Sequence, residues 1–211
     1  KRMQCWSEFS PALYRLNIEM ITPEGNDNQQ VDFGMRNFAV SGTQFQINGL
    51  TTFLRGTHSA INFPLTGYPS MKTADWQAVF RTARSYGINH YRFHSVTPPK
   101  AAFEAADIEG IYMQPELPLG YGVSPDDQSG FNEYMISMGL NILQNYSNHA
   151  SFVMFALGNE LDGSAKSNEQ SLKIVSLFRQ QNPEMLYSYG SNNSLGDYGQ
   201  AEGEDYFTTV R

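Results

Sequence analysis

From about residue 52 onward, short apolar segments alternate with amphipathic ones, and this alternation restricts the possible fold more than any other feature of the sequence. The apolar segments are typical of buried strands, and they cover residues 52–57, 88–94, 111–116, 152–157, 186–190 and 205–210. Apolar residues at helical spacing predict helices over residues 73–87, 98–110, 131–147 and 168–181. Strands that alternate with helices predict a parallel sheet with helices packed beside it.

The ends of two predicted helices carry recognisable signals. Thr73 is placed to cap the helix over 73–87, and Gly87 is placed to end it. Two prolines open the next helix, and Gly110 follows its last turn. The segment between Gly190 and Asp205 is polar and rich in glycine, so we expect it to be irregular.

Two architectures fit this order of elements: a doubly wound sheet and a (β/α)₈ TIM barrel. The sequence contains no G-x-G-x-x-G fingerprint after a strand and no G-x-x-x-x-G-K-[ST] motif, which favours the barrel. Only six strand candidates are present, whereas a complete barrel has eight strands in about 250 residues. We therefore expect residues 41–211 to form an incomplete (β/α)₈ barrel, as part of a longer enzyme.

The first 40 residues are expected to be β-structure. Residues 12–21 alternate apolar and polar side chains and predict a strand, 23–30 predict a hairpin or a loop, and 31–40 predict the returning strand. Within 45–56 we expect two short strands around a tight Asn48-Gly49 turn.

Composition excludes several functional classes. The net charge of −7 and the absence of a basic patch argue against nucleic acid as a partner. No run of about 18 apolar residues is present, so no membrane-spanning helix is expected. The single cysteine, Cys5, cannot form an internal disulfide, and we expect it to be a small buried apolar residue rather than a nucleophile.

Polar side chains follow the predicted strands at the point where each strand ends. Because active sites of α/β barrels lie at these ends, the residues are candidates for a common site. They are His58, Arg92, His94, Glu116, Asn159, Glu160, Asn192, Asn193 and Arg211. A metal site at His90 and His94 is disfavoured, because Arg92 would place a positive charge beside the ion. No cofactor is implied.

Carboxylates beside arginine, histidine and asparagine suit glycoside hydrolysis, in which one carboxyl group protonates the leaving oxygen and a second acts as nucleophile or base. The amide of Asn159 could bind a sugar hydroxyl. Simpler interpretations remain open. An Asn-Glu pair after a strand can be a helix cap or a solvated pair, and a buried Arg92 can form a structural ion pair with Glu116 or Glu160. Asp107 is expected on its helix surface or pinning a loop.

The order of several segments resembles glycoside hydrolase family 2. These segments are WSEFSPALYRL, FGMRNF, FQINGLTTFLRGTHSAINFP, FRTARSYGINHYRFHS, PPKAAFEAADIEGIYMQPELP and NHASFVMFALGNE. By position, the resemblance implies that Glu160 is the acid/base and that Asn159 contacts the sugar 2-hydroxyl. It also implies that Arg92 orients the nucleophile and that His58 and His94 line the sugar pocket. Glu116 and Asn193 are expected to help bind substrate.

The same resemblance implies a retaining, exo-acting β-glycosidase, with a β-galactoside as the leading substrate. Its nucleophile, a glutamate, is expected beyond Arg211, because Glu202 and Glu204 come too early and in a different context. Residues 1–40 would be the last strands of an immunoglobulin-like β-sandwich domain. The partner is a carbohydrate, an oligomer is possible, and a periplasmic or extracellular location is compatible with such an enzyme.

Two other hypotheses remain. The chain could be a non-catalytic carbohydrate-binding or structural barrel, or a lyase that uses His94 and Arg92 on an acidic sugar.

Overall fold

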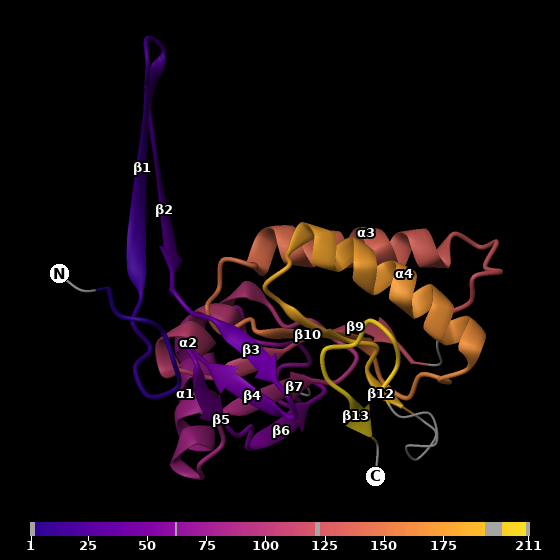
Figure 1. Cartoon of the computed structure of the whole chain (residues 1–211). Coiled ribbons are helices and arrows are strands. Elements are labelled where there is room, and N and C mark those ends of the chain that lie inside the picture. Colours follow the sequence, from indigo (N-terminus) through magenta and orange to yellow (C-terminus); the bar gives the residue numbers. More distant parts are fainter. Residues whose placement is uncertain (1–2, 62, 121–122, 193–199, 210–211) are drawn as a thin grey trace.

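A computed structural model describes residues 3–61, 63–120, 123–192 and 200–209 of the chain. Parallel strands and the helices between them make up most of it, and a long two-stranded ribbon projects from this body (Figure 1). Among the described helices, none is both long enough and apolar enough to cross a membrane.

The parallel strands form several small sheets, and within each of them neighbouring strands follow chain order. Two three-stranded parallel sheets, β6-β7-β8 and β9-β10-β11, are linked by a bridge between Met113 and Phe152. A further parallel pair, β12-β13, lies at the end of the chain. The strands are β6 (Gly56–Ser59), β7 (His90–Phe93), β8 (Tyr112–Gln114), β9 (Glu116–Leu119), β10 (Met154–Gly158), β11 (Leu186–Ser188), β12 (Ser191–Asn192) and β13 (Thr208–Thr209).

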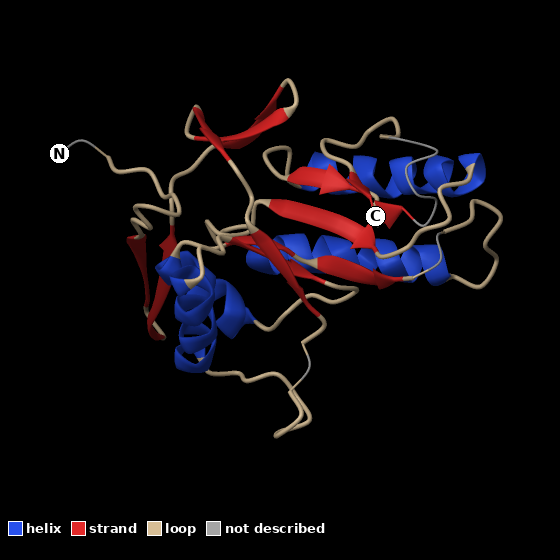
Figure 2. Ribbon diagram, turned by 90° about the horizontal axis from the view of Figure 1, so that it is seen from below, coloured by secondary structure: helices blue, strands red, loops and turns tan. Residues whose placement is uncertain are grey.

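Four helices connect these strands and cover one side of the sheet. They are α1 (Thr73–Ser85), α2 (Lys100–Glu109), α3 (Phe131–Tyr146) and α4 (Ala165–Gln181). Figure 2 shows α3 and α4 running beside the strands β9, β10 and β11. The alternation of strands and helices predicted from the sequence is confirmed, whereas the described residues do not form a closed ring of strands.

The first parallel strand lies further along the chain than predicted. The strand expected over 52–57 is wrong, because Thr52 ends β5 (Leu50–Thr52) and β6 begins only at Gly56. The Arg55 N–H between them donates to Asn89 Oδ1 over 2.7 Å, and Phe53 is 67% exposed. The apolar pair Phe53-Leu54 therefore lies in the connection between β5 and β6, not in a strand.

The predicted strand over 111–116 is split in two. Pro115 separates β8 from β9, because proline has no N–H to donate to a neighbouring strand. The pairing of β9 with β10 then shifts register, since Ala156 faces Glu116 but Gly158 faces Leu119. Such bulges redirect the side chains that follow them, and here they precede Asn159.

The helix α1 begins at Thr73 as predicted, but its capping residue differs from the prediction. The N-cap of α1 is Lys72, and Thr73 is not a cap because its hydroxyl donates to Glu104 Oε2 on α2 over 2.6 Å. The end of α2 is as predicted: Gly110 adopts a left-handed conformation with φ of 71°.

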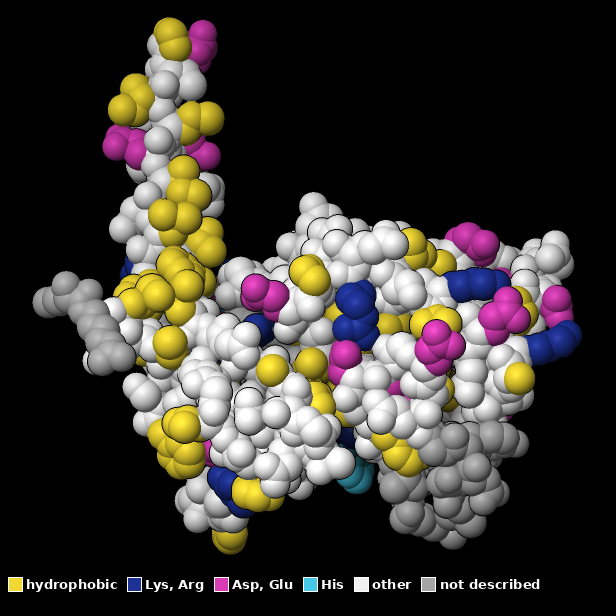
Figure 3. Space-filling view, viewed as in Figure 1, with side chains coloured by type: hydrophobic (Ala, Val, Ile, Leu, Met, Phe, Trp, Pro, Cys, Tyr) yellow, Lys and Arg dark blue, Asp and Glu magenta, His cyan; other side chains and the backbone are white. Residues whose placement is uncertain are grey.

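The ribbon consists of β1 (Tyr14–Thr22) and β2 (Gly25–Phe33), which pair in one continuous antiparallel register from Tyr14–Phe33 to Thr22–Gly25. Of the hairpin or loop predicted over 23–30, the hairpin is confirmed, but its turn consists of Pro23 and Glu24 alone, and residues 25–30 belong to β2. Polar residues fill β2 because both faces of the ribbon are largely exposed. Figure 3 shows apolar side chains along it, which on β1 include Leu16, Ile18, Met20 and Ile21.

A three-stranded antiparallel sheet joins the ribbon to the body. It contains β3 (Phe38–Ser41), β4 (Gln44–Ile47) and β5. The predicted Asn48-Gly49 turn is confirmed, with positive φ at both residues, as a type I′ turn requires. Phe38 and Ile47 pack with Trp6, Tyr112 and Tyr206 in a second apolar cluster, apart from the main core between sheet and helices.

Cys5 is exposed, so the expectation that it is a small buried apolar residue is wrong. Its neighbour Trp6 fills the apolar site instead and donates its indole N–H to the Asp107 carbonyl over 2.8 Å.

Candidate functional site

An ion pair between neighbouring strands forms the centre of the candidate site. Arg92 Nε on β7 donates to Glu116 Oε1 over 2.6 Å, and Arg92 Nη2 lies 3.3 Å from Glu116 Oε2. Glu116 also accepts from the Ser95 N–H over 2.7 Å. Burial raises the pKa of the Glu116 carboxyl, while the bonds from Arg92 and Ser95 oppose that increase. Of the two partners predicted for Arg92, Glu116 is the one it contacts.

The Asn159 side chain is held in one orientation by two donors. Its Oδ1 accepts from Arg92 Nη2 over 2.7 Å and from Ser191 Oγ over 2.8 Å. Because both bonds require an oxygen at that position, the amide NH₂ is the group of Asn159 that remains to bind a ligand. A ligand atom at this amide must therefore be a hydrogen-bond acceptor.

Glu160 follows Asn159 at the end of β10 in an unusual backbone conformation. Its φ is 52°, in the left-handed region that non-glycine residues rarely adopt, and its N–H donates to Ser191 Oγ over 3.1 Å. The Asn159 N–H donates to the Leu119 carbonyl over 2.9 Å. Within the described part of the chain, the partly buried Glu160 carboxylate has neither a hydrogen bond nor an ion pair. Backbone strain of this kind is common at functional sites.

The two predicted pocket histidines are neighbours. The rings of His58 on β6 and His94 after β7 have centroids 5.9 Å apart, and His94 Nδ1 lies 3.2 Å from Ser95 Oγ. His58 faces Arg92 in the register of β6 with β7, so both histidines lie at the strand ends beside the ion pair.

His90 lies deeper in the sheet than His94. Burial and the nearby Arg92 charge lower its pKa to about 4, so its imidazole is neutral at pH 7. Among the described residues, no group of three or more histidine, cysteine, aspartate or glutamate side chains could hold a metal ion.

Two of the predicted site residues, Asn193 and Arg211, lie outside the described residues. The Glu204 carboxylate accepts hydrogen bonds from Ser188 Oγ and from the N–H groups of Tyr189 and Ala201. It therefore fixes the turn over 201–204 against β11.

Asp107 holds the segment that leads into β10. It is buried rather than on the helix surface, and it contacts His149 Nδ1 over 2.6 Å and accepts from the Ser151 N–H over 2.8 Å. The alternative that it pins a loop is therefore confirmed. Arg36 donates to the carbonyls of Ala150 and Phe152, so the same segment is also fixed from the N-terminal part of the chain.

Ser191 and Ser95 belong to the hydrogen-bond network of the site but were not predicted from the sequence. Ser191 bonds both Asn159 and the Glu160 backbone, and Ser95 bonds Glu116. Both come directly after predicted strands, Ser191 after 186–190 and Ser95 after 88–94, and this position is only a weak signal because serine is common there.

Known proteins with similar sequences are β-galactosidases. The chain is 28% identical over 163 residues to the β-galactosidase of Psychromonas ingrahamii, covering 74% of this chain and 16% of that protein. It is 25% identical over 202 residues to the β-galactosidase of Photobacterium profundum, covering 92% of this chain and 19% of that protein. The chain thus spans less than a fifth of the length of these relatives. No family model matches it.

Solved structures with the same fold are also glycosidases. The β-D-glucuronidase of Dictyoglomus thermophilum superposes with a TM-score of 0.84 at 18% identity, covering 98% of this chain and 37% of that one. The Eisenbergiella tayi GH2 β-galacturonidase gives a TM-score of 0.79 at 17% identity, covering 92% of this chain and 34% of that one.

These comparisons place the chain among homologues of glycoside hydrolases. The resemblance to glycoside hydrolase family 2 is confirmed: the chain is a family 2-like segment that is similar to bacterial β-galactosidases in sequence and to family 2 enzymes in fold.

Proposed function

We propose that the chain is part of a retaining, exo-acting β-glycosidase and that β-galactosides are its leading substrates. Its parallel strands would be part of a (β/α)₈ catalytic barrel. Residues 1–40 would be the last strands of a β-sandwich domain, and residues 41–211 would belong to the barrel. The observation that carries the proposal is the network of Arg92, Asn159 and Ser191, which orients the Asn159 amide and anchors the Glu160 backbone.

In this proposal Glu160 is the general acid. It would protonate the glycosidic oxygen as the bond from the sugar C1 to that oxygen breaks, and a second carboxylate about 5–5.5 Å away would attack C1. Glu160 would then take a proton from the water that releases the sugar. The Glu160 carboxylate has no partner among the described residues, so no competing ion pair has to break before it acts.

Asn159 would hold the substrate through its NH₂ group. Since its Oδ1 already accepts two hydrogen bonds, it would donate to the oxygen of the sugar 2-hydroxyl. This bond accelerates the reaction only if it strengthens in the transition state. Arg92 and Glu116 would position Asn159, since the Glu116 side chain is completely buried against Arg92. His58, His94 and Asn193 are proposed to contact the sugar or its neighbouring groups.

The test is Glu160→Gln in the full-length protein, with two β-galactosides that differ in their leaving group. We expect turnover of an alkyl galactoside to fall about 10²–10⁴-fold, since general acid catalysis contributes that much. A 2,4-dinitrophenyl galactoside needs little protonation of its leaving group and should lose far less in the first step. Glu169→Gln, an exposed glutamate paired with Lys173 on α4, is the matched control and should keep parental activity.

Each outcome separates the hypotheses. Equal turnover of Glu160→Gln and the parent on both substrates would remove Glu160 from the acid/base role and favour a lyase. Saccharide binding without hydrolysis by the parent would favour the non-catalytic alternative. Faster hydrolysis of a β-glucuronide than of a β-galactoside would overturn the choice of sugar and keep the proposed chemistry.

A further inference from the structure

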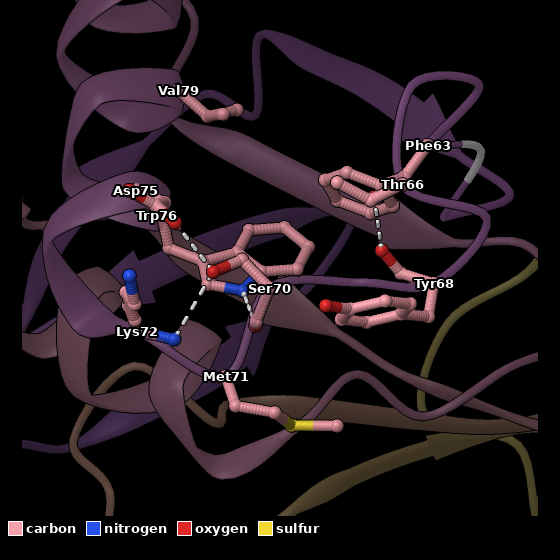
Figure 4. A pocket seen from close by; sticks show the side chains of 9 residues that line it. All are labelled: Phe63, Thr66, Tyr68, Ser70, Met71, Lys72, Asp75, Trp76 and Val79. Atoms are coloured by element: carbon pink, nitrogen blue, oxygen red, sulfur yellow. Dashed lines mark hydrogen bonds between the residues drawn. The ribbon is translucent and has the colours of Figure 1, made fainter.

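A second pocket lies apart from the Arg92 site, between the connection that follows β6 and the first turns of α1. Its volume is about 480 Å³. The lining residues are Phe63, Thr66, Tyr68, Ser70, Met71, Lys72, Asp75, Trp76 and Val79 (Figure 4). None of them takes part in the hydrogen bonds around Arg92, Glu116 and Asn159. A volume of this size falls within the range of about 300–1,000 Å³ that is usual for small-molecule sites.

The polar groups that line this pocket are bonded mainly to one another. Ser70 Oγ donates to Asp75 Oδ2 over 2.5 Å and accepts from the Lys72 N–H over 3.1 Å. The Trp76 indole N–H donates to the Ser70 carbonyl over 2.8 Å. The Thr66 hydroxyl donates to the Tyr68 carbonyl over 2.8 Å. The Ser70 hydroxyl and the Trp76 indole N–H are therefore already bonded within the wall of the pocket.

The remaining surface of the pocket is aromatic and apolar. Trp76 is almost fully buried and meets Phe63 edge to face, with ring centroids 5.5 Å apart. Tyr68 and Met71 are 62% and 69% exposed. Figure 4 shows the rings of Phe63, Tyr68 and Trp76 gathered around one space, with the Met71 side chain at its edge. Grouped aromatic rings favour another ring, which they can contact edge to face or in an offset stack.

A saccharide is a poor fit for this surface. Each sugar hydroxyl that loses water without gaining a protein partner costs about 1–3 kcal/mol. An aromatic ring has no such requirement, and covering apolar surface favours its binding by about 25 cal/mol per Å². Among the described residues, the Tyr68 hydroxyl and the Lys72 ammonium have no hydrogen-bond or ion-pair partner, so each of them can donate to an acceptor on a bound ring.

We propose that this pocket is a binding site for a planar aromatic molecule that carries a hydrogen-bond acceptor. It is distinct from the sugar site at Asn159 and Glu160. Because the connection leaves β6 directly after His58 and Ser59, the pocket adjoins the end of the sheet at which the candidate active site lies.

The test is calorimetric titration of the full-length protein with 2-naphthol, which has two fused rings and one oxygen. We expect saturable binding with one site in the parent and at least a tenfold higher Kd in Tyr68→Ala. Met71→Ala, which removes a second exposed wall of the pocket, should also raise the Kd. The matched control is Tyr86→Ala, because Tyr86 is 83% exposed at the other end of α1 and should leave the Kd unchanged.

Two further binding measurements distinguish this pocket from the sugar site. Galactose in excess should not displace 2-naphthol, and the Glu160→Gln protein should bind 2-naphthol as the parent does, whether or not it hydrolyses glycosides. Displacement by galactose, equal binding by Tyr68→Ala and the parent, or no saturable binding would overturn the proposal. The last result would be expected if another part of the full-length protein already fills the pocket.

Discussion

Arg92 donates to both oxygens of Glu116, and the Glu116 side chain is completely buried whereas that of Arg92 is 18% exposed. A carboxylate without solvent contact is tolerated only if it is paired and hydrogen-bonded. The same guanidinium also holds Asn159, so one cation supports both the burial of Glu116 and the orientation of the amide.

The first prediction concerns loss of that cation. Arg92→Met leaves the Glu116 carboxylate buried without its partner, and we expect the free energy of unfolding to fall by about 3–5 kcal/mol in urea titrations. Arg15→Met is the control, because Arg15 and Asp32 form an exposed pair on the ribbon, and its effect should be small. Adding Glu116→Gln to Arg92→Met should recover part of the loss. If Arg92→Met and Arg15→Met lowered the free energy of unfolding equally, Arg92 would not be the cation that stabilises the buried Glu116 carboxylate.

The second prediction concerns acid. The native pKa of His90 is lowered from 6.5 to about 4, so between these values the unfolded chain binds a proton that the native state does not. The free energy of unfolding should therefore fall as pH decreases from 6.5 to 4, by up to about 3 kcal/mol from this group. His90→Gln, which keeps a polar side chain beside Gln114 and Arg92, should remove that part of the pH dependence. Parallel stability–pH curves for the variant and the parent would disprove it.

The third prediction concerns backbone contact beneath Asn159. A Cβ atom at Gly158 would lie 2.0 Å from the Leu119 carbonyl oxygen, which is backbone and cannot rotate away. We expect Gly158→Ala to lower stability by about 3 kcal/mol, the upper part of the usual range for overpacking, and to lower turnover by displacing Asn159 from Arg92. Gly120→Ala is the control, because its Cβ would meet no atom within 4 Å. Thermal melting and turnover of both variants provide the measurement.

The fourth prediction concerns the buried carboxylate of Glu8, which joins the N-terminal segment to the sheet. It accepts from Thr52 Oγ1, Arg55 Nη2 and Asn89 Nδ2 over 3.1, 2.9 and 2.9 Å. Glu8→Ala leaves these donors without their acceptor and should lower the free energy of unfolding by about 3 kcal/mol.

The control for this change is Glu24→Ala, in the exposed turn of the ribbon, which should be nearly neutral. A loss at position 8 no larger than the loss at position 24 would show that the carboxylate does not stabilise the junction.

The spacing of apolar residues and the chemistry of individual side chains made much of the fold predictable from the sequence. Strand-like segments correctly located β7, β10 and β11, and the polar residues inside or directly after them led to Arg92 and Asn159. An arginine inside an apolar strand also required a buried partner, which is Glu116. These features were accessible because each follows from the residue itself and its spacing.

Other features depend on contacts between distant parts of the chain. The polar strand β2 is paired along its whole length, although its composition resembles a loop. Phe53 and Leu54 have side chains typical of strands, but they lie in the connection between β5 and β6, which is fixed by the contact of Arg55 with Asn89. Ser191 matters because its hydroxyl lies between Asn159 and Glu160, which are more than 30 residues away along the chain. Serine is too common after strands for its identity alone to indicate this.

The ribbon of β1 and β2 has a consequence for handling the protein. One of its faces carries Tyr14, Leu16, Ile18 and Met20 together with Val31 and Phe33, and the outer edge of each strand has no strand beside it within the described residues. Unpaired backbone N–H and carbonyl groups at the edge of an apolar face can bind another chain as a further strand. A preparation of these 211 residues alone should therefore become turbid or oligomeric as its concentration rises, and Lys in place of Ile18 should keep it dispersed.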